Sequence, residues 1–285
     1  MDFLKKYWRE VLVSILILSN IFVWLAFRDR EPSETLTVYF LDVGQGDAIL
    51  IDSPKHIRVL VDGGKNRKVL TELGKILPFA DKRIDVVLAT HPDADHIGGL
   101  PEVASRFNVE IFIEPGVESE NSIDDELHRR LDKENITKLI ARRGMVVNLG
   151  NGAKLQILFP TQDVSNWETN RASIVARLVY GDHEFLLTGD SPSPIEKVLI
   201  SLDEKTLDVD VLKAGHHGSR TSTSPEFAEA TSPEYAIISA SKDNTYGHPH
   251  KEVLDILNKV NAKILSTADL GTIKFETNGQ TLKIK

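Results

Sequence analysis

The chain contains no cysteine among its 285 residues. This absence excludes disulfide bonds, zinc sites built from thiolates and a cysteine nucleophile. A bound transition metal must therefore be held by the side chains of His, Asp, Glu or Asn.

The chain also lacks an excess of basic residues, because 34 Lys and Arg face 42 Asp and Glu and the net charge is −8. This balance argues against tight, metal-independent binding to a nucleic-acid backbone. It does not exclude chemistry on phosphate esters, because bound metal ions supply positive charge that a count of residues misses. The sequence shows no array of aromatic residues for stacking on nucleobases.

One long uncharged stretch stands at the N-terminus, Val11–Phe27 (VLVSILILSNIFVWLAF). Its length and composition predict a single transmembrane helix over residues 11–27, with residues 28–34 as a linker. Basic residues are slightly more frequent before the stretch than after it, which predicts that residues 1–10 are cytoplasmic and that the body lies outside the cytoplasmic membrane. A cleaved signal peptide is the alternative, and the absence of a small-x-small cleavage site disfavours it.

The remaining residues, 35–285, are long enough and apolar enough to bury a full core. Two successive runs of apolar strands each pass into alternating helices and strands, which predicts an α/β domain with two similar halves. Two sheets stacked face to face with helices outside would accommodate both halves in one domain.

The densest group of ionisable residues lies at the end of the apolar run 84–89. His91, Asp93, Asp95 and His96 fall within six residues, and a helix-like segment follows over 97–107. Four such groups cannot share a dry pocket unless a cation offsets their charge, and imidazole with carboxylate suits a divalent metal. The alternative interpretation is a solvated acidic loop.

Other chemically active residues also follow apolar strands, namely Asp62, Asp190 and His216. Strand ends at one edge of a layered sheet can bring such distant groups to a single rim. Glycines beside them allow tight turns and close approach of the backbone.

Seven motifs occur in the order LDVGQGDA, VDGG, THPDADHIGGL, N-x-x-S, LLTGD, LKAGHHGS and N-x-Y-G-H-P. In this order they resemble the metallo-β-lactamase superfamily, and most closely the C-terminal domain of ComEC-type DNA-uptake proteins and their stand-alone relatives. The resemblance covers Leu36–Lys285. It implies a four-layer αβ/βα sandwich, here preceded by the transmembrane helix, with two divalent metal ions at the edge of the sheets.

The resemblance also implies roles for individual residues. His91 and Asp93 match ligands of the first metal, and Asp95 and His96 match ligands of the second. Asp190 matches the bridging carboxylate, and Asp62 a residue that orders the ligand loop. His216 matches the last histidine ligand, although His217 would serve equally well.

Two positions depart from the pattern of the wider superfamily. Asp93 stands where most members have histidine, which shifts the expected metal from Zn²⁺ toward Mn²⁺ or another ion that prefers oxygen. A separate histidine normally lies between the His91 cluster and Asp190, and here the N-x-x-S stretch Asn170–Ser173 occupies its place.

Further residues near these motifs are candidates for contact with substrate. Asp95 could accept a proton from the attacking water, and His248 could donate one to the leaving group or contact a phosphate. Lys213, His217 and Ser219 could also hold a phosphate. The alternatives are that His248 is a hydrogen-bonded loop residue and that Lys213 and Ser219 order the turn.

Together these features predict a membrane-anchored, metal-dependent hydrolase that uses a metal-activated water. The expected substrates are phosphodiesters, including single-stranded DNA. One alternative is hydrolysis of a small ester, lactone or lactam at the same metals. Another is a membrane-tethered binding module with a vestigial metal site.

Overall fold

The computed structural model describes residues 2–28 and 34–285, with side chains for residues 7–21 and 34–285. The chain divides into two units, Met1–Ser33 and Glu34–Lys285. The first unit contains helix α1 (Asp2–Arg28), which includes the predicted apolar segment 11–27. Most of the predicted linker, residues 29–33, and residue 1 lie outside the described residues. Among the residues described, no helix is both long enough and apolar enough to cross a bilayer.

One sheet of the second unit has eight strands in the order β15-β14-β1-β2-β3-β4-β5-β6. Strands β3 to β6 are parallel to one another, and the remaining neighbours are antiparallel. The strands are β1 Leu36–Phe40, β2 Ile49–Asp52, β3 Arg58–Val61, β4 Arg83–Leu88, β5 Asn108–Glu114, β6 Thr137–Ile140, β14 Ile273–Thr277 and β15 Leu282–Ile284.

The other sheet has seven strands in the order β13-β12-β11-β10-β9-β8-β7. Its strands β10 to β13 are parallel, and β7 to β10 are antiparallel. The strands are β7 Val146–Gly150, β8 Ala153–Phe159, β9 Val175–Tyr180, β10 His183–Leu187, β11 Val211–Lys213, β12 Tyr235–Ile238 and β13 Lys263–Ser266.

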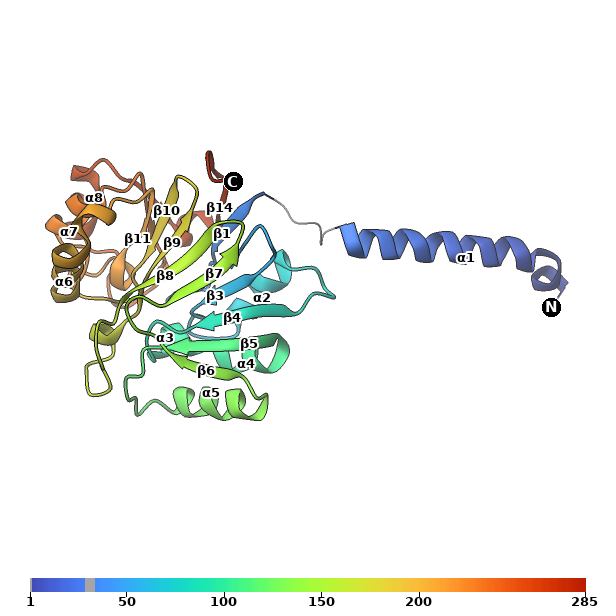
Figure 1. The fold of residues 1–285 in the computed structure, drawn as a ribbon, viewed down its shortest axis with the longest axis horizontal. Helices are drawn as coiled ribbons and strands as arrows, with labels where there is room; N and C mark the ends of the chain where they lie inside the picture. The colour runs from blue at the N-terminus through green and yellow to red at the C-terminus, as the bar shows by residue number, and fades with distance from the viewer. Residues whose placement is uncertain (1, 29–33) are drawn as a thin grey trace. The chain divides into compact units, whose positions relative to one another are not determined.

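The helices of this unit fall into two sets, one on the outer face of each sheet (Figure 1). The eight-stranded sheet is covered by α2 Lys68–Ile76, α3 Ala94–Ile97, α4 Leu100–Arg106 and α5 Ser122–Lys133. The seven-stranded sheet is covered by α6 Ser193–Asp203, α7 Pro225–Thr231 and α8 Lys251–Lys259. The short helix α9 (Thr267–Leu270) follows β13, and 3₁₀ turns lie at Asn170–Ala172, Glu204–Thr206 and Gly215–Gly218.

The alternation of side chains along the strands creates four layers. In β1, Val38 and Phe40 point into the core between the sheets, whereas Leu50 of β2 packs against the outer helices. Across the central core, Phe275 of the eight-stranded sheet meets Phe185 of the seven-stranded sheet with ring centroids 5.8 Å apart. Each fully buried apolar side chain of this kind contributes about 1.5–3 kcal/mol. The predicted layered α/β sandwich is therefore confirmed.

The predicted helix over 97–107 is in fact two helices, α3 and α4, which are separated at Gly98 and Gly99. A Cβ atom on Gly98 would lie 2.1 Å from the carbonyl oxygen of Lys65, and one on Gly99 would lie 2.3 Å from that of Gly63. The two glycines thus allow the loop after β3 to pack directly on the turn that carries the ionisable cluster. Strands β3 and β4 are parallel neighbours in one sheet, and β10 and β11 are parallel neighbours in the other. The C-terminal ends of all four strands place polar side chains on one rim.

Candidate metal centre

Asp62, at the end of β3, fixes the turn that follows β4. Its carboxylate accepts hydrogen bonds from the Thr90 backbone N–H at 2.7 Å and from the Thr90 hydroxyl at 2.8 Å. The same carboxylate lies 2.8 Å from Nδ1 of His96. All three residues are buried. Asp62 therefore orders the loop, as the resemblance implied, and Nε2 of His96 faces Asp190 at 3.2 Å and Nε2 of His217 at 3.3 Å.

The Thr90 hydroxyl also orients His91. This oxygen donates to Asp62 and lies 3.0 Å from Nδ1 of His91, so the hydrogen-bond network assigns the proton to that Nδ1. Nε2 of His91 is then unprotonated and has no hydrogen-bond partner in the described structure, although it is buried.

The histidine doublet lies on a strained turn after β11. His216 and His217 have backbone φ angles of 48° and 56°, in the left-handed region that costs a non-glycine residue of order 1–3 kcal/mol. Nδ1 of His216 lies 3.1 Å from the hydroxyl of Thr221. Nδ1 of His217 faces the carboxylate of Asp47 at 3.4 Å. His216 is thus held through Nδ1 by a hydroxyl, whereas Nδ1 of His217 faces a carboxylate without a hydrogen bond in the described structure.

The four imidazoles converge on one carboxylate. The Nε2 atoms of His91, His96, His216 and His217 lie 4.0, 3.2, 3.5 and 3.6 Å from the nearer side-chain oxygen of Asp190. Both members of the doublet face this carboxylate, so the geometry does not select one of them over the other.

Two further carboxylates extend the cluster in different directions. Asp93 Oδ2 lies 3.7 Å from Nε2 of His91, and Asp95 Oδ2 lies 3.4 Å from Nε2 of His217. The Asp93 side chain is 39% exposed and that of Asp95 is 26% exposed. The cluster therefore opens toward solvent on the side of these two carboxylates.

This donor set fits divalent metal ions. Unprotonated Nε2 atoms and carboxylate oxygens are the ligands that such ions use in proteins. One ligand atom each from Asp47, His96, Asp190 and His217 lies within 4.8 Å of the others. Buried atoms of His91 (Nε2) and Asp190 (Oδ1) have no hydrogen-bond partner in the described structure, as expected where a cation completes the site.

The pKa values of the cluster also indicate a site that requires positive charge. Burial and the charge of His96 lower the pKa of His91 to about 4. Burial also disfavours charge on His217, but Asp190 and Asp47 outweigh it and raise the pKa of His217 to about 9. Burial alone would raise the pKa of Asp190, but the charges of His217 and His96 hold it well below its usual range. Protons on imidazoles therefore stand in for the positive charge that these carboxylates require.

Asp47 is a member of the cluster that the sequence analysis did not single out as a ligand or a positioning residue. It is 1% exposed and lies 2.8 Å from the ammonium of Lys213, which is fully buried and also donates to the Ala214 carbonyl. The predicted phosphate contact of Lys213 stays a prediction, and the observed partner of its ammonium is Asp47. In the sequence Asp47 lies in the glycine-flanked LDVGQGDA stretch, which spacing alone could not connect to β11.

The remaining candidates lie around the doublet. Ser219 is buried, donates its N–H to the His216 carbonyl and accepts from the Thr221 hydroxyl at 3.0 Å, so it orders the turn. The ring of His248 lies 5.5 Å from that of His216 and 6.3 Å from that of His217, measured between centroids. Burial, followed by the charges of the neighbouring imidazoles, lowers the pKa of His248 to about 4. The buried Nδ1 of His248 has no hydrogen-bond partner in the described structure.

Ser173, the last residue of the N-x-x-S stretch, supports Asp190. Its hydroxyl accepts a hydrogen bond from the Asp190 backbone N–H at 3.3 Å, and the side chain is fully buried. This stretch therefore has a positioning contact at the place where a histidine would be expected.

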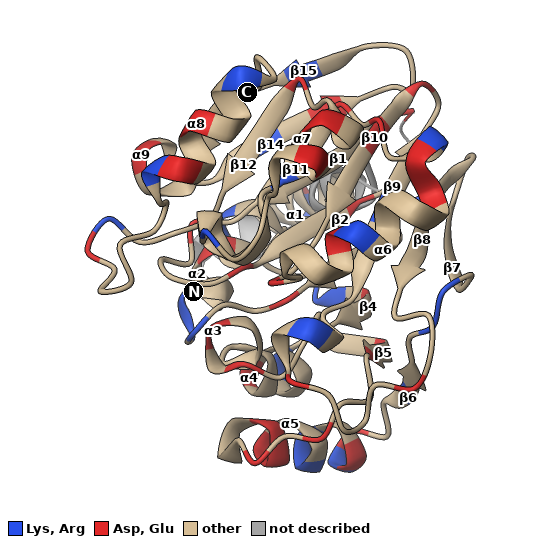
Figure 2. Cartoon of the chain, turned by 90° about the vertical axis from the view of Figure 1, so that its left-hand side faces the viewer, with Lys and Arg blue, Asp and Glu red and all other residues tan. Residues whose placement is uncertain are grey.

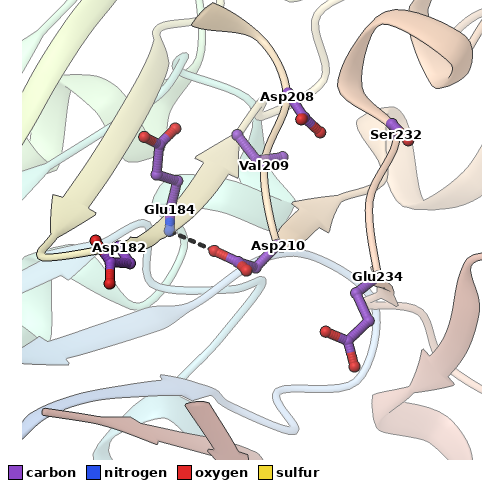
Figure 3. Close-up of a pocket in the computed structure, with 7 residues that line it drawn as sticks. All are labelled: Asp182, Glu184, Asp208, Val209, Asp210, Ser232 and Glu234. Carbon is purple, nitrogen blue, oxygen red and sulfur yellow. Dashed lines mark hydrogen bonds between the residues drawn. The ribbon is translucent and has the colours of Figure 1, made fainter. Parts of the chain in front are cut away.

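A separate pocket of about 310 Å³ lies at the opposite end of the parallel strands of the seven-stranded sheet (Figure 3). Its lining residues are Asp182, Glu184, Asp208, Val209, Asp210, Ser232 and Glu234. Glu184 donates its backbone N–H to Asp210 at 2.7 Å, as drawn in Figure 3. Five carboxylates without a lining basic residue would repel an anionic substrate, so this pocket is not a candidate for binding one.

Acidic residues are also present on the outer helices α5, α6, α7 and α8, with basic residues on several of them (Figure 2). The distribution agrees with the net charge of −8. An anion would therefore bind best at the Asp/His cluster, since bound cations there would reverse the local charge.

A family model described as the metallo-beta-lactamase superfamily matches residues 41–242. The chain belongs to the metallo-β-lactamase superfamily. The fold, this match and the buried Asp/His cluster together make it a hydrolase of the metallo-β-lactamase fold with a candidate metal centre.

The resemblance to ComEC-type proteins is confirmed by three curated relatives. ComE operon protein 3 of Bacillus subtilis is 31% identical over 84% of this chain and 32% of its own length. Competence protein ComA of Neisseria gonorrhoeae is 29% identical over 87% of this chain and 33% of its own length. Recombination protein 2 of Haemophilus influenzae is 31% identical over 88% of this chain and 30% of its own length. This metallo-β-lactamase-fold chain thus spans about a third of the length of these relatives.

Solved structures support the same fold. The metallo-β-lactamase fold protein YhfI of Bacillus subtilis superposes with a TM-score of 0.57, at 14% identity over 85% of this chain and all of that one. CmlA, a diiron β-hydroxylase from Streptomyces venezuelae, gives a TM-score of 0.55 at 17% identity, over 82% of this chain and 52% of that one. At these identities the similarity establishes the architecture alone.

Proposed function

We propose that the chain is a metal-dependent phosphodiesterase that acts on nucleic acid, including single-stranded DNA. The observation that carries the proposal is the convergence of four Nε2 atoms on Asp190, with Nδ1 of His91, His96 and His216 at hydrogen-bond distance from a polar side chain and Nδ1 of His217 facing Asp47 at 3.4 Å. Metal-binding histidines typically have such a polar group behind Nδ1, which directs Nε2 at the ion.

The pairings of side chains support two subsites that share Asp190. His91, Asp93 and His216 would hold one ion, and His96, Asp95 and His217 would hold the other. This assignment rests on the separations of Asp93 from His91 and of Asp95 from His217, 3.7 and 3.4 Å. It gives each member of the doublet a role and supplies the third histidine that the wider superfamily takes from another motif.

A bound pair of divalent ions would supply a water of lowered pKa and positive charge opposite a phosphoryl oxygen. Asp95, partly exposed at the opening of the cluster, would accept the proton of the attacking water. His248, beside the doublet, would contact the phosphoryl group or the leaving oxygen. Asp190 would keep the four imidazoles directed at a common centre.

Two further observations support this substrate class. The printed names of the relatives, competence protein and recombination protein, refer to processes on DNA. The three carboxylates Asp93, Asp95 and Asp190 give the site hard oxygen ligands that favour Mn²⁺ over Zn²⁺.

The test is a substrate panel with the full chain in detergent, with and without Mn²⁺. We expect Mn²⁺-dependent cleavage of bis(p-nitrophenyl) phosphate and of single-stranded DNA. Asp190→Asn should lower kcat/KM on both by at least 10³-fold, and Asp182→Asn, at the opposite end of the strands, should leave it within twofold. Cleavage of ester, lactone or lactam substrates alone would reject the phosphodiesterase proposal, and turnover retained in Asp190→Asn would reject the site.

We also propose that the apolar segment 11–27, whose side chains are described only as far as residue 21, anchors the chain in the cytoplasmic membrane with the hydrolase domain outside the cytoplasm. Support comes from the uncharged stretch Val11–Phe27 and from the large apolar side chains exposed on the helix between Val11 and Ile21. Fractionation should recover the chain with membranes after an alkaline wash. Labelling of an engineered cysteine near Lys285 by a reagent that cannot enter the cell is the expected result, and labelling from the cytoplasmic side alone would overturn the orientation.

A further inference from the structure

A groove of about 410 Å³ lies beside the metal centre and is formed by three loops at the same rim. The loops are residues 43–45 after β1, residues 65–68 after β3 and residues 241–246 after β12. The first two loops are continuous in sequence with Asp47 and Asp62, and the third leads to His248. Backbone hydrogen bonds from Gly63 to His96 and from Gly64 to Asp47 connect these loops to the cluster, so the groove lies at the rim where the proposed reaction occurs.

The loop that forms one wall of the groove is held by its own hydrogen bonds. The Asn244 side-chain NH₂ donates to the carbonyls of Ser241 and His248, and its oxygen accepts from the His248 N–H at 2.9 Å. The Ser241 N–H donates to the Gln45 side chain across the groove at 3.4 Å. These bonds hold the backbone on both sides of Tyr246, which lies between Asn244 and His248.

Tyr246 presents a large aromatic ring to solvent. The residue is 61% exposed, and one face of its ring stacks on His248, with 5.7 Å between centroids and 23° between planes. His248 in turn meets His216 at 5.5 Å. A row of rings thus leads from the metal cluster to the surface, and it ends in an aromatic ring on the rim of the groove.

The lining of the groove also includes two lysines. Lys65 is exposed and has no carboxylate at ion-pair distance among the residues that the structure describes. Lys68 is paired with Asp42 at 2.8 Å, so its charge is largely offset. Asp243 is the exposed acidic residue of the lining. An anion in the groove would therefore bind near Lys65 and Asn66, away from Asp243.

We propose that this groove binds the single-stranded nucleic-acid segment next to the scissile phosphodiester, with a base stacked on Tyr246 and a phosphate at Lys65. The proposal rests on the phosphodiesterase function and extends it by a subsite. A stacking ring beside a cation is how proteins bind single strands without reading their sequence. Two ring-to-ring steps of 5.7 and 5.5 Å separate Tyr246 from the metal ligands. A strand of one or two nucleotides covers such a distance.

The test compares a polynucleotide with a small phosphodiester in the full chain. The substrates are dodecathymidylate and bis(p-nitrophenyl) phosphate, both with Mn²⁺. Because Tyr246→Ala removes one base-stacking contact, it should raise KM for dodecathymidylate about tenfold. The loss of kcat/KM for bis(p-nitrophenyl) phosphate in the same variant should be at least fivefold smaller than the loss for dodecathymidylate. Tyr246→Trp should restore the KM for dodecathymidylate to within twofold of the wild type.

Matched controls come from residues of the same type outside the groove. Phe79 is 98% exposed in the turn before β4, and Phe79→Ala should leave both substrates unaffected. Lys65→Gln should lower the slope of log KM for dodecathymidylate against log salt by about 0.7, the value for one phosphate contact in a single strand. Lys197→Gln on α6 should leave that slope unchanged.

The outcomes separate this proposal from the function on which it rests. An equal loss on both substrates in Tyr246→Ala, or no loss on dodecathymidylate, would overturn the subsite while leaving the phosphodiesterase intact. Failure of the wild type to cleave either substrate would reject the function. In that case fluorescence anisotropy of labelled dodecathymidylate in EDTA tests whether the groove binds a single strand. Tyr246→Ala should bind dodecathymidylate more weakly than the wild type does, and equal binding by the two proteins would reject the groove as a binding site.

Discussion

The two proposed subsites differ in what stands behind their histidines. Carboxylates of Asp62 and Asp47 face Nδ1 of His96 and His217, whereas hydroxyls of Thr90 and Thr221 face Nδ1 of His91 and His216. A carboxylate partner raises the basicity of an imidazole ligand more than a hydroxyl does. The subsite of His96 and His217 should therefore bind its ion more tightly.

The buried Lys213–Asp47 pair should be needed for stability as well as for the orientation of His217. Lys213→Met removes the ammonium and leaves Asp47 buried without its partner, which typically costs about 3–5 kcal/mol in free energy of unfolding. Urea unfolding of the metal-free chain would measure this loss. Adding Asp47→Asn to Lys213→Met should recover at least half of it. A single variant as stable as the wild type would show that the pair is not what holds this loop.

The residues that the sequence could not place are those whose roles depend on distant contacts. The sequence could predict a cluster of His91, Asp93, Asp95 and His96 from their spacing, because all four lie on one turn. Asp47 acts through Lys213 and His217, more than 160 positions later, and no local pattern reports such a contact. The doublet presented a choice between its two members, whereas in the structure consecutive left-handed residues turn both rings toward Asp190.

At the scale of elements, the conformation of the loop after β1 depends on close backbone contact with the turn that carries residues 91–96. Gly46 has φ +112°, and a Cβ on it would lie 1.9 Å from the Asp95 carbonyl oxygen. Gly46→Ala should displace the two loops, destabilise the fold by about 1–3 kcal/mol and lower Mn²⁺ affinity at least tenfold. Calorimetric titration and thermal unfolding would measure both effects.

Gly44 provides the matched control in the same loop. Its φ is +83°, but a Cβ there would meet no atom within 4 Å. Gly44→Ala should therefore show only the conformational cost of about 1 kcal/mol, with Mn²⁺ affinity within twofold of the wild type. Equal losses of affinity in both variants would contradict the contact between the loops.

Helix α5 contains a carboxylate that should make stability depend on pH. Burial, with the charges of Glu114 and Asp125, raises the pKa of Asp124 from 3.8 to about 6, although His128 at 3.6 Å opposes the shift. Because the fold favours the protonated form, this contribution is present below pH 3.8 and is lost as the pH rises through about 6.

Asp124→Asn removes this dependence. The variant should be more stable than the wild type by about 1 kcal/mol at pH 8, after allowance for solvent screening, and no more stable at pH 4. Thermal unfolding at the two pH values would measure the difference. A gain of equal size at both would contradict the raised pKa of Asp124.

Elements were predicted best where apolar residues recur with a clear period. The apolar run 84–89 agrees with β4 (Arg83–Leu88) to within one residue at each end, since most of this strand is buried. The edge strand β6 has no such signal, because all four of its residues are exposed and show no alternation. The short strand β15 at the other edge and the one-turn helix α9 carry similarly little pattern.

At the scale of the whole chain, the net charge of −8 and the predicted anionic substrate are reconciled by the metal centre. Carboxylates on the outer helices and in the pocket of Figure 3 repel a polyanion over much of the surface. The rim, with bound cations and Lys65 beside it, is where that repulsion would be reversed. On the proposed function, an anionic strand would bind at this one edge of the two sheets.

The central claim is that imidazoles and carboxylates from distant strand ends bind a pair of divalent ions around Asp190. Metal analysis by mass spectrometry, on protein purified without chelator and equilibrated with Mn²⁺, tests it most directly. The wild type should contain close to two Mn²⁺ per chain and Asp190→Asn less than half of that. A content near zero in the wild type, unchanged by added Mn²⁺, would contradict the account.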